Sequence, residues 1–355
     1  GVKEARRNVY KMAKYIIGRD LSQRQVDSIL IKLAGKNKSK MGANATVALS
    51  MAFCAASANE VGVPIYEYLN KNACILPIPL MNIINGGQHA GNELAIQEFM
   101  IIPIKFKRFS EALRAGCEIY YILKNIVIER YGKSAKNVGD EGGFAPPMKV
   151  TTEALDCIMS AINKAGYMDK VFIGIDCASS NFFDGKKYNI DCKVMESDQL
   201  LEYYAGLVKD YPIISIEDPF HEKDWKAFAK ATRELDTQIV GDDILVSNIK
   251  YLKRGIKEKA GNAILLKVNQ VGTLIEAINT ANYAKKNDWN VIVSHRSGET
   301  EDTFIADLAV ALETGQIKTG APCRGERTAK YNQLLRIEES LGKKARYGCR
   351  LGKRL

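Results

Sequence analysis

The chain has 355 residues, of which 46% are hydrophobic and 26% are charged, and its formal net charge is +10. A chain of this length and composition forms one large domain or two and can bury a large core. No apolar run approaches the roughly 18–20 residues that cross a bilayer, so no membrane span is expected.

The eight cysteines are scattered, without a CxxC pair or a cysteine–histidine cluster. Disulfide scaffolds are small and dense in cysteine, so we expect mostly buried thiols in a reducing compartment and no zinc bound through cysteine. Positive charge is densest in the tail, Leu341–Leu355. The chain has no zinc finger and no aromatic RNA-binding signature, so we expect no nucleic-acid partner. We interpret the tail as solvated, with contact to an anionic surface as the alternative.

The first 70 residues are predicted to be helical. Apolar residues recur at helical spacing in Lys3–Ile17. A second helix is expected to begin at Asp20 or Ser22, either of which suits an N-cap, and to end at Gly35. The segment Gly42–Gly62 is rich in Ala and Ser, which is typical of a helix packed closely against others.

Three prolines interrupt the helical pattern that precedes them, in the segment Val63–Gly87. We therefore place a domain junction near Asn70–Cys74. The chain is divided on this basis into residues 1–71, a helical domain, and residues 72–355, which carry the chemistry.

A repeated pattern follows residue 100, in which a short run of Ile, Val and Leu ends in polar residues and a helical stretch comes next. Strands that alternate with helices and read as continuous apolar runs indicate a parallel sheet covered on both faces. The polar residues at the predicted strand ends are Asp176, Glu217, Asp242, Lys267, His295 and Lys318.

The pattern alone fits either a (β/α) barrel or a doubly wound open sheet. In a barrel the carboxyl ends of the strands converge on one mouth, whereas in an open sheet they spread along an edge. The polar residues at these ends make chemical sense as a single site. This favours an α/β fold of the TIM-barrel type, (β/α)8, for the larger domain.

Three of the strand ends carry acids, Asp176, Glu217 and Asp242, with no histidine beside them. Carboxylate oxygens are the ligands of hard cations, so this set favours Mg²⁺ over zinc. The alternative is that each acid is a helix cap or a loop residue paired with a nearby base. Three acids at the same level of a barrel favour the metal.

The basic residues at the other strand ends suit an anionic substrate. Lys267 follows a buried strand, and burial beside metal ions would favour its neutral form, which makes it a candidate general base; the alternative is a structural lysine paired with an acid. Lys318 lies in the same way on the last strand and suits a substrate carboxylate. His295, Arg296 and Ser297 offer a guanidinium and a hydroxyl to a phosphate.

Two glycine-containing segments add further candidates. "GDEGGFAPP" places Asp140 and Glu141 between glycines, where the backbone can approach a ligand closely. "NGGQHAGNELAIQEFM" combines a flexible loop with His89, Gln97 and Glu98. Neither segment matches a P-loop or a Rossmann fingerprint.

These segments together resemble the enolase family. The motifs, in chain order, are "NGGQHAGNELAIQEFM", "GDEGG", "IGIDCASS", "SIEDPF", "LLKVNQ", "SHRSGETEDTFIADLAV" and "GQIKTGAPCRGER". The resemblance runs from Gly1 to about Gly342. It implies an N-terminal α+β domain followed by a modified barrel that opens ββαα, in a cytoplasmic glycolytic enzyme. The implied reaction is the Mg²⁺-dependent dehydration of 2-phospho-D-glycerate to phosphoenolpyruvate, with two Mg²⁺ ions.

The resemblance also implies a role for each matching residue. Lys267 would be the base that takes the C2 proton, Glu141 the acid that protonates the departing C3 hydroxyl, and Glu98 its assistant. The remaining residues would bind metal or substrate: Asp176, Glu217 and Asp242 the first metal, Lys318 and Gln97 the carboxylate, Arg296 and Ser297 the phosphate, with His89 and His295 lining the pocket.

The sequence departs from the family at its start, because enolases carry a β meander with a mobile serine loop before the segment that matches Gly1. We therefore expect a truncated, mostly helical N-terminal domain, an incomplete second-metal site and a doubtful homodimer. The alternative function is a non-catalytic structural or binding protein with the enolase fold. A racemase-like member of the superfamily is disfavoured by "SHRSG" and by the acid of "GDEGG".

Overall fold

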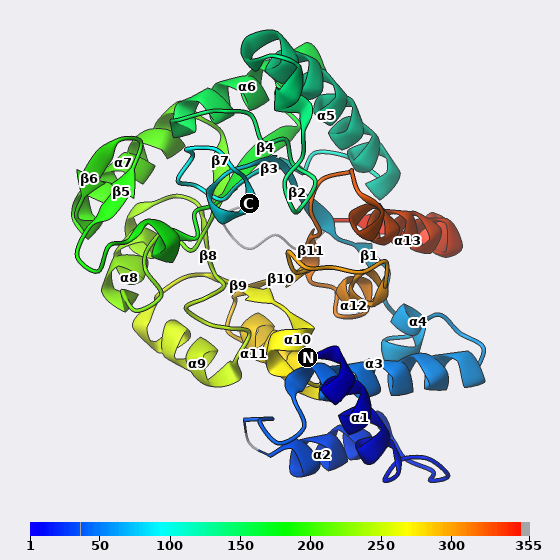
Figure 1. Ribbon diagram of the computed structural model, residues 1–355. Coiled ribbons are helices and arrows are strands. Elements are labelled where there is room, and N and C mark those ends of the chain that lie inside the picture. The colour runs from blue at the N-terminus through cyan, green and yellow to red at the C-terminus, as the bar shows by residue number, and fades with distance from the viewer. Residues whose placement is uncertain (36, 349–355) are drawn as a thin grey trace.

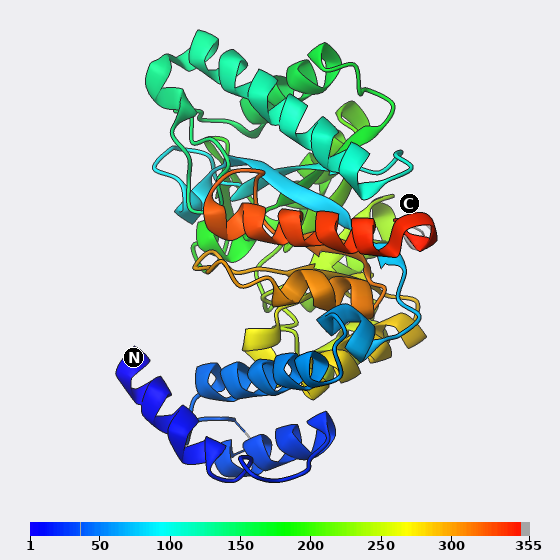
Figure 2. The same cartoon turned by 90° about the vertical axis from the view of Figure 1, so that its right-hand side faces the viewer.

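The computed structural model describes residues 1–35 and 37–348, which form a helical N-terminal part and a closed barrel ringed by helices (Figure 1). The N-terminal helices lie together beside the barrel, on the side of α10, α11 and α12 (Figures 1 and 2). They are α1 (Val2–Ala13), α2 (Gln23–Ala34), α3 (Ala43–Glu60) and α4 (Ile65–Leu69). The predicted α/β barrel behind a mostly helical N-terminal domain is confirmed.

Eight strands close the barrel in the order β10-β11-β2-β3-β4-β7-β8-β9. Strand β3 runs antiparallel to both neighbours, and all other pairs are parallel. The bounds are β2 (Ile78–Asn85), β3 (Glu98–Pro103), β4 (Val171–Asp176), β7 (Ile213–Glu217), β8 (Gln238–Gly241), β9 (Ala263–Leu266), β10 (Asn290–Ser294) and β11 (Gly315–Lys318).

Helices α5 (Phe109–Tyr131) and α6 (Thr151–Lys164) follow the antiparallel pair, so the barrel opens ββαα as the resemblance implies. The remaining ring helices are α7 (Ser197–Asp210), α8 (Trp225–Glu234), α9 (Ile249–Glu258), α10 (Val268–Val271), α11 (Leu274–Lys286), α12 (Phe304–Ala311) and α13 (Gly325–Leu341). Short accessory pairs are β1 (Ile75–Leu76) with β12 (Arg346–Tyr347) and β5 (Tyr188–Ile190) with β6 (Lys193–Met195). The 3-10 turns are η1 (Gly87–His89), η2 (Lys133–Lys136), η3 (Ser179–Phe182) and η4 (Gly342–Lys344).

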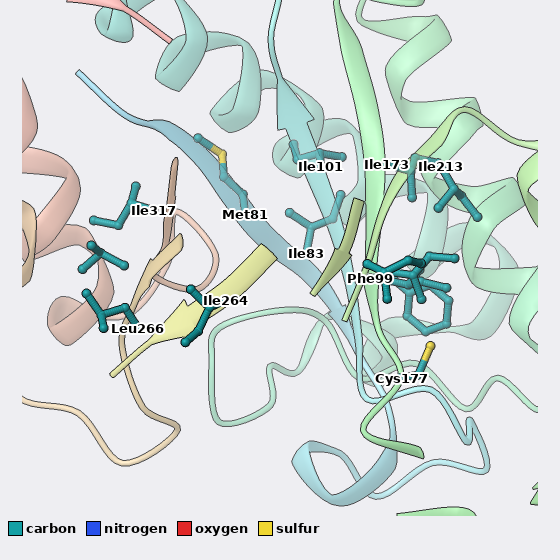
Figure 3. Packing of buried hydrophobic residues seen from close by; sticks show 14 of the residues in the cluster. Met81, Ile83, Phe99, Ile101, Ile173, Cys177, Ile213, Ile264, Leu266 and Ile317 are labelled. Carbon is teal, nitrogen blue, oxygen red and sulfur yellow. The ribbon is translucent and has the colours of Figure 1, made fainter. Parts of the chain in front are cut away.

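Buried apolar side chains fill both faces of the barrel sheet, because successive residues of a strand point to opposite faces. In β9, Ala263 and Leu265 belong to the cluster that fills the barrel interior. Ile264 and Leu266 belong to the larger cluster between strands and helices, which Figure 3 shows together with residues of β2, β3 and β4. This arrangement explains why the strands read as continuous apolar runs in the sequence.

The N-terminal helices dock onto the first turn of α11 and complete its cap. The side chain of the N-cap residue Thr273 donates to Glu276 Oε2 at 2.6 Å and accepts no hydrogen bond from the backbone amides of this turn. Instead, the amide of Leu274 donates to Ser50 Oγ at 2.9 Å and the amide of Ile275 donates to Asp27 Oδ2 at 2.8 Å. Helix N-terminal amides need such acceptors, so these bonds fix the position of the helical part against the barrel.

The predicted ends of α2 are found in the structure, whereas α1 ends earlier than predicted. Ser22 caps α2 through a capping box with Gln25, and the helix stops before Gly35. Helix α1 ends at Ala13 rather than at Ile17, because the following residues form tight turns before Gly18, whose φ is +74°. Glycine tolerates this left-handed backbone without strain.

The cysteine prediction needs a correction. Only three of the seven described cysteines are buried, whereas Cys117 and Cys192 are exposed; all seven are free thiols. Cys349 and three of the six basic residues of the tail Leu341–Leu355 fall at 349–355, outside the described residues. Within the described range, no helix combines the length and the apolar character that crossing a bilayer requires.

A buried acid in α12 gives a testable pH dependence. Burial raises the pKa of Asp307 to about 6, against an ordinary value of 3.8. The folded state therefore binds this proton more tightly than the unfolded state, and the stability that it contributes below about pH 4 is lost as pH rises through 6. The free energy involved is about 3 kcal/mol. We expect Asp307→Asn, which preserves the side-chain shape, to flatten this part of the stability profile.

Urea unfolding of the wild type and of Asp307→Asn between about pH 4 and pH 7 measures the effect. The exposed Asp169→Asn is the matched control and should leave the slope unchanged. A profile of Asp307→Asn that is parallel to the wild type would refute the assignment.

Candidate active site at the barrel mouth

The strand ends bring three acids side by side. Because β3 is antiparallel to β4, its first residue, Glu98, lies at the same end of the barrel as the last residue of β4, Asp176, and the two are register partners. Asp176 is in turn the register partner of Glu217, the last residue of β7. All three carboxylates are buried, and together they form one wall of the barrel mouth.

Lys318 reaches this wall from β11. Its Nζ lies 2.8 Å from Asp176 Oδ2, 2.9 Å from Glu217 Oε2 and 3.2 Å from Glu98 Oε2. Burial acts to lower the pKa of Lys318, but the carboxylates of Asp176 and Glu217 outweigh it and raise that pKa well above its usual range. Lys318 is therefore a fixed positive charge in a site from which water is largely excluded.

Lys267 and Asp242 form a second pair at the ends of β9 and β8, in which Lys267 Nζ donates to Asp242 Oδ2. Burial acts to lower the pKa of Lys267, but Asp242 and then Glu217 outweigh it, and the pKa is raised. Asp242 thus stabilises the ammonium form of Lys267. The neutral form is expected beside bound metal ions and stays a prediction. The alternative considered for the sequence, a lysine paired with an acid, is what the structure shows.

The three acids predicted to bind metal share the mouth, but their oxygens do not form one cluster. Lys318 stands between Asp176 and Glu217, whereas an Asp242 oxygen lies within 4.8 Å of oxygens from Asp218 and Asp243. Asp218 was not singled out from the sequence. Its carboxylate accepts the backbone N–H groups of Asp242 at 3.0 Å and Asp243 at 2.8 Å, and so orients the end of β8.

The chemistry of these donors fits a hard cation. Asp242 Oδ1 is buried and has no hydrogen-bond partner within the described chain. Burial, and next the charge of Asp176, raise the pKa of Glu217 well above its usual range. The positive charges of Lys267 and Lys318 therefore do not offset the negative charges of the acids around them. Additional positive charge beside Asp176, Glu217 and Asp242 would relieve this repulsion.

Glu98 of this wall also lies close to a further buried acid, Glu141, and His89 is beside both. His89 Nδ1 lies 3.7 Å from Glu98 Oε1 and 3.9 Å from Glu141 Oε1. Burial, then the charge of Glu141, raise the pKa of Glu98 well above its usual range. Burial also opposes the charge of Glu141, but His295, Lys318 and His89 outweigh it and hold the pKa of Glu141 well below its usual range. The two directions are opposite, so a proton in this pair is favoured on Glu98 over Glu141.

The loop that carries Glu141 approaches its neighbours as closely as its glycines suggest. A Cβ atom on Gly139 would lie 2.4 Å from the carbonyl oxygen of His89, and one on Gly143 would lie 2.6 Å from Asn85 Oδ1. Gly142 has a φ of +86°, which L side chains rarely adopt. The loop can thus hold Glu141 against the barrel only with glycine at these positions.

The candidate phosphate-binding residues lie after β10. Arg296 and Ser297 are exposed at the mouth, whereas His295 is buried beneath them. Arg296 donates to Asn269 Oδ1 at 3.1 Å, and Ser297 Oγ lies 2.9 Å from His89 Nε2. Gln97 is half-buried and accepts a hydrogen bond from Asn181 at 3.4 Å.

Arg327 in α13 was also missed by the sequence analysis, although it contacts His295 directly. It is fully buried, and its guanidinium donates to the backbone of the two loops that carry Glu141 and Ser297. The sequence does indicate that Arg327 is buried. Tyr331 and Leu334 lie on the buried face of α13, and Arg327 lies one helical turn before Tyr331 on that face. A charged residue on an apolar stripe is buried only when it is paired.

Both parts of the chain match models of a known protein family. Residues 73–354 match the family model described as the enolase C-terminal TIM barrel domain, and residues 1–69 match the model described as the enolase N-terminal domain. A curated enolase of Methanocaldococcus jannaschii is 56% identical over 330 residues, which is 92% of this chain and 78% of that relative.

Proposed function

This chain belongs to the enolase family, and from that premise we propose that it dehydrates 2-phospho-D-glycerate to phosphoenolpyruvate with Mg²⁺. Enolase-type lyase activity is supported by the relative that matches most of the chain. The observation that carries the specific reaction is the meeting of Lys267 and Lys318 with buried acids at one barrel mouth. The comparisons do not favour the non-catalytic alternative.

The difficult step is the removal of a proton next to a carboxylate, because it leaves a dianionic enediolate. We assign Lys318 to stabilise this charge, since its ammonium is buried at the mouth next to Glu98, Asp176 and Glu217. A bound Mg²⁺ held by Asp176, Glu217 and Asp242 would supply further positive charge at the enediolate and would compete with Lys267 for Asp242.

Lys267 is the proposed base. It takes the C2 proton in its neutral form, and the electron pair of the C2–H bond passes into the enediolate. In the structure, Asp242 holds Lys267 as an ammonium. Neutral Lys267 therefore requires that Asp242 be engaged elsewhere, which links readiness of the base to occupancy of the cation site.

The pair Glu98 and Glu141 is the proposed acid. The C3–O bond breaks as the enediolate collapses, and the hydroxyl leaves as water with a proton from this pair. We assign the delivery of the proton to Glu141 and its storage to Glu98, whose pKa is the raised one. Ser297 Oγ, which donates to Glu141 Oε1 at 3.3 Å, keeps that carboxylate oriented.

Substrate anions are assigned to the remaining mouth residues. Arg296 and Ser297 would receive the phosphate, because they are exposed and offer a charged fork and a hydroxyl. Lys318 and Gln97 would face the carboxylate, with His89 and His295 lining the pocket between the two ends.

A cytoplasmic location is proposed on the family alone. The division of the chain into residues 1–71 and 72–355 is proposed from the prolines that follow Val63. The incomplete second Mg²⁺ site and the doubtful homodimer stay expectations, and sedimentation velocity tests the dimer. The curated relative supports a phosphorylated small-molecule substrate.

Proton NMR tests the proposed substrate. With Mg²⁺, 2-phospho-D-glycerate is expected to give the vinyl signals of phosphoenolpyruvate, whereas 3-phosphoglycerate and unphosphorylated glycerate are expected to stay unchanged. Arg296→Met should raise KM more than it lowers kcat, because it removes a contact with the unreacting phosphate. Equal turnover of phosphorylated and unphosphorylated glycerate would contradict the assignment of the phosphate end.

A further inference from the structure

Arg327 is the most heavily bonded buried cation near the site to which the proposed reaction gives no role. Its Nη1 lies 2.6 Å from His295 Nδ1 and donates to the carbonyl oxygen of Arg296 at 2.7 Å. Its Nη2 donates to the carbonyl oxygens of Asp140 at 3.0 Å and Ser297 at 2.6 Å. One guanidinium thus joins the loop of the acid to the loop of the phosphate site.

The contact with His295 fixes which ring nitrogen carries the proton. An arginine side chain only donates, so His295 Nδ1 must accept. The single proton of the neutral imidazole is then on Nε2. Burial lowers the pKa of His295, which favours this neutral ring.

The orientation of Nε2–H matters because of what it faces. His295 Nε2 lies 3.2 Å from Glu141 Oε2, although the two are not aligned as a full hydrogen bond. In the opposite tautomer, a bare Nε2 lone pair would face the carboxylate and repel it. Arg327 therefore makes His295 a donor toward the acid pair and its substrate.

The chain is built to admit this arginine. The Cβ of any residue larger than glycine at position 320 would lie 2.8 Å from Arg327 Cδ and 2.7 Å from the carbonyl oxygen of Glu141. The backbone at Gly320, with a φ of +81°, also favours glycine, and its carbonyl oxygen accepts a 2.5 Å hydrogen bond from Tyr331. The β11–α13 connection thus leaves a channel for the Arg327 stem.

We propose that Arg327 is a positioning residue that holds His295 in the Nε2–H tautomer and locks the Asp140–Glu141 loop to the His295–Ser297 loop. The consequence for catalysis rests on the proposed function, in which Glu141 supplies the proton and Ser297 binds phosphate. The tautomer itself does not depend on that function and can be observed without substrate.

The spectroscopic test uses the small number of histidines. The chain has three, His89, His221 and His295, so NMR of isotope-labelled imidazole nitrogens resolves each ring. In the wild type, His295 is expected to show a protonated Nε2 and a bare Nδ1. In Arg327→Ala, its two nitrogen signals should shift toward each other as the tautomers mix, and added guanidinium ion should restore them. His221 should not move.

The kinetic test uses the same variant. Arg327→Ala is expected to lower kcat by about 10–100-fold, the range seen when a partner that orients a site residue is removed, with a smaller change in KM. Guanidinium chloride should recover most of this loss, whereas ammonium chloride at equal ionic strength should not. Arg336→Ala, which removes an exposed arginine of α13, is the control and should resemble the wild type.

Arg327→Met separates positioning from folding. It retains much of the side-chain volume but has no N–H group to donate to His295 Nδ1. A folded Arg327→Met with a mixed His295 tautomer and reduced kcat would support the proposal even where Arg327→Ala is poorly folded. A wild-type tautomer of His295 in folded Arg327→Met would overturn it. The wild-type chain could also prove inactive on 2-phospho-D-glycerate while the Arg327 variants still show altered His295 signals. That result would support the tautomer claim and refute the proposed function.

Discussion

Substitution of Lys267 by Ala is expected to lower the turnover of 2-phospho-D-glycerate by about 10²–10⁴-fold, the range for loss of a positioned general base. The fold should persist, because Lys267 lies at the end of β9 and its removal frees Asp242, which is close to the mouth and can be solvated or bind a cation. The loss should appear in kcat, since the proton is transferred in the chemical step.

The control for this prediction is Lys257→Ala, which removes an exposed lysine from α9. Phosphoenolpyruvate formation and circular dichroism of both variants would be compared with the wild type. If Lys267→Ala retained turnover within a few-fold of Lys257→Ala, the base would have to be sought elsewhere.

Substitution of Lys318 by Met is expected to affect both stability and activity. The variant leaves Glu98, Asp176 and Glu217 buried without their shared ammonium, and breaking a buried pair in this way costs about 3–5 kcal/mol. Turnover should fall by at least about 10²–10³-fold, because the removed charge is the one assigned to the forming enediolate.

The stability loss of Lys318→Met should depend on pH with a definite sign. The unpaired carboxyl groups gain raised pKa values in the folded state, so their penalty is present above those values and fades as acid protonates them. Urea unfolding at neutral and acidic pH, with exposed Lys343→Met as control, measures the effect. A pH-independent loss, or none, would contradict the electrostatic account.

Much of the site follows from the sequence because strand ends carry strong signals. Apolar runs that stop at Asp176, Glu217 and Lys318 mark both the strand and its functional end. A closed barrel then requires these ends to converge, since parallel strands share one mouth. Glu98 lies at the mouth only because β3 is antiparallel, which brings its first residue to the end where the parallel strands finish. The family resemblance implies this strand direction, whereas periodicity does not.

The sequence does not reveal the groups that act through the backbone. Asp218 binds amide groups and Arg327 binds mainly carbonyl groups, and every residue offers these atoms, so no pattern of side-chain types identifies the partners. The sequence also left open whether Lys267 pairs with an acid, because this pairing depends on the separation of Lys267 from Asp242 and not on the burial that the strand pattern indicates. Pairwise distances of this kind arise only in the folded chain.

The central claim is that the acids and lysines of the barrel mouth carry out a cation-dependent dehydration. The most direct measurement is the absorbance of phosphoenolpyruvate formed from 2-phospho-D-glycerate by this 355-residue chain, first with Mg²⁺, then with EDTA, and then with Mg²⁺ restored. The account predicts turnover that EDTA abolishes and Mg²⁺ recovers, and that is lost in Asp242→Asn. Turnover that persists in EDTA, or no turnover with Mg²⁺ present, would contradict it.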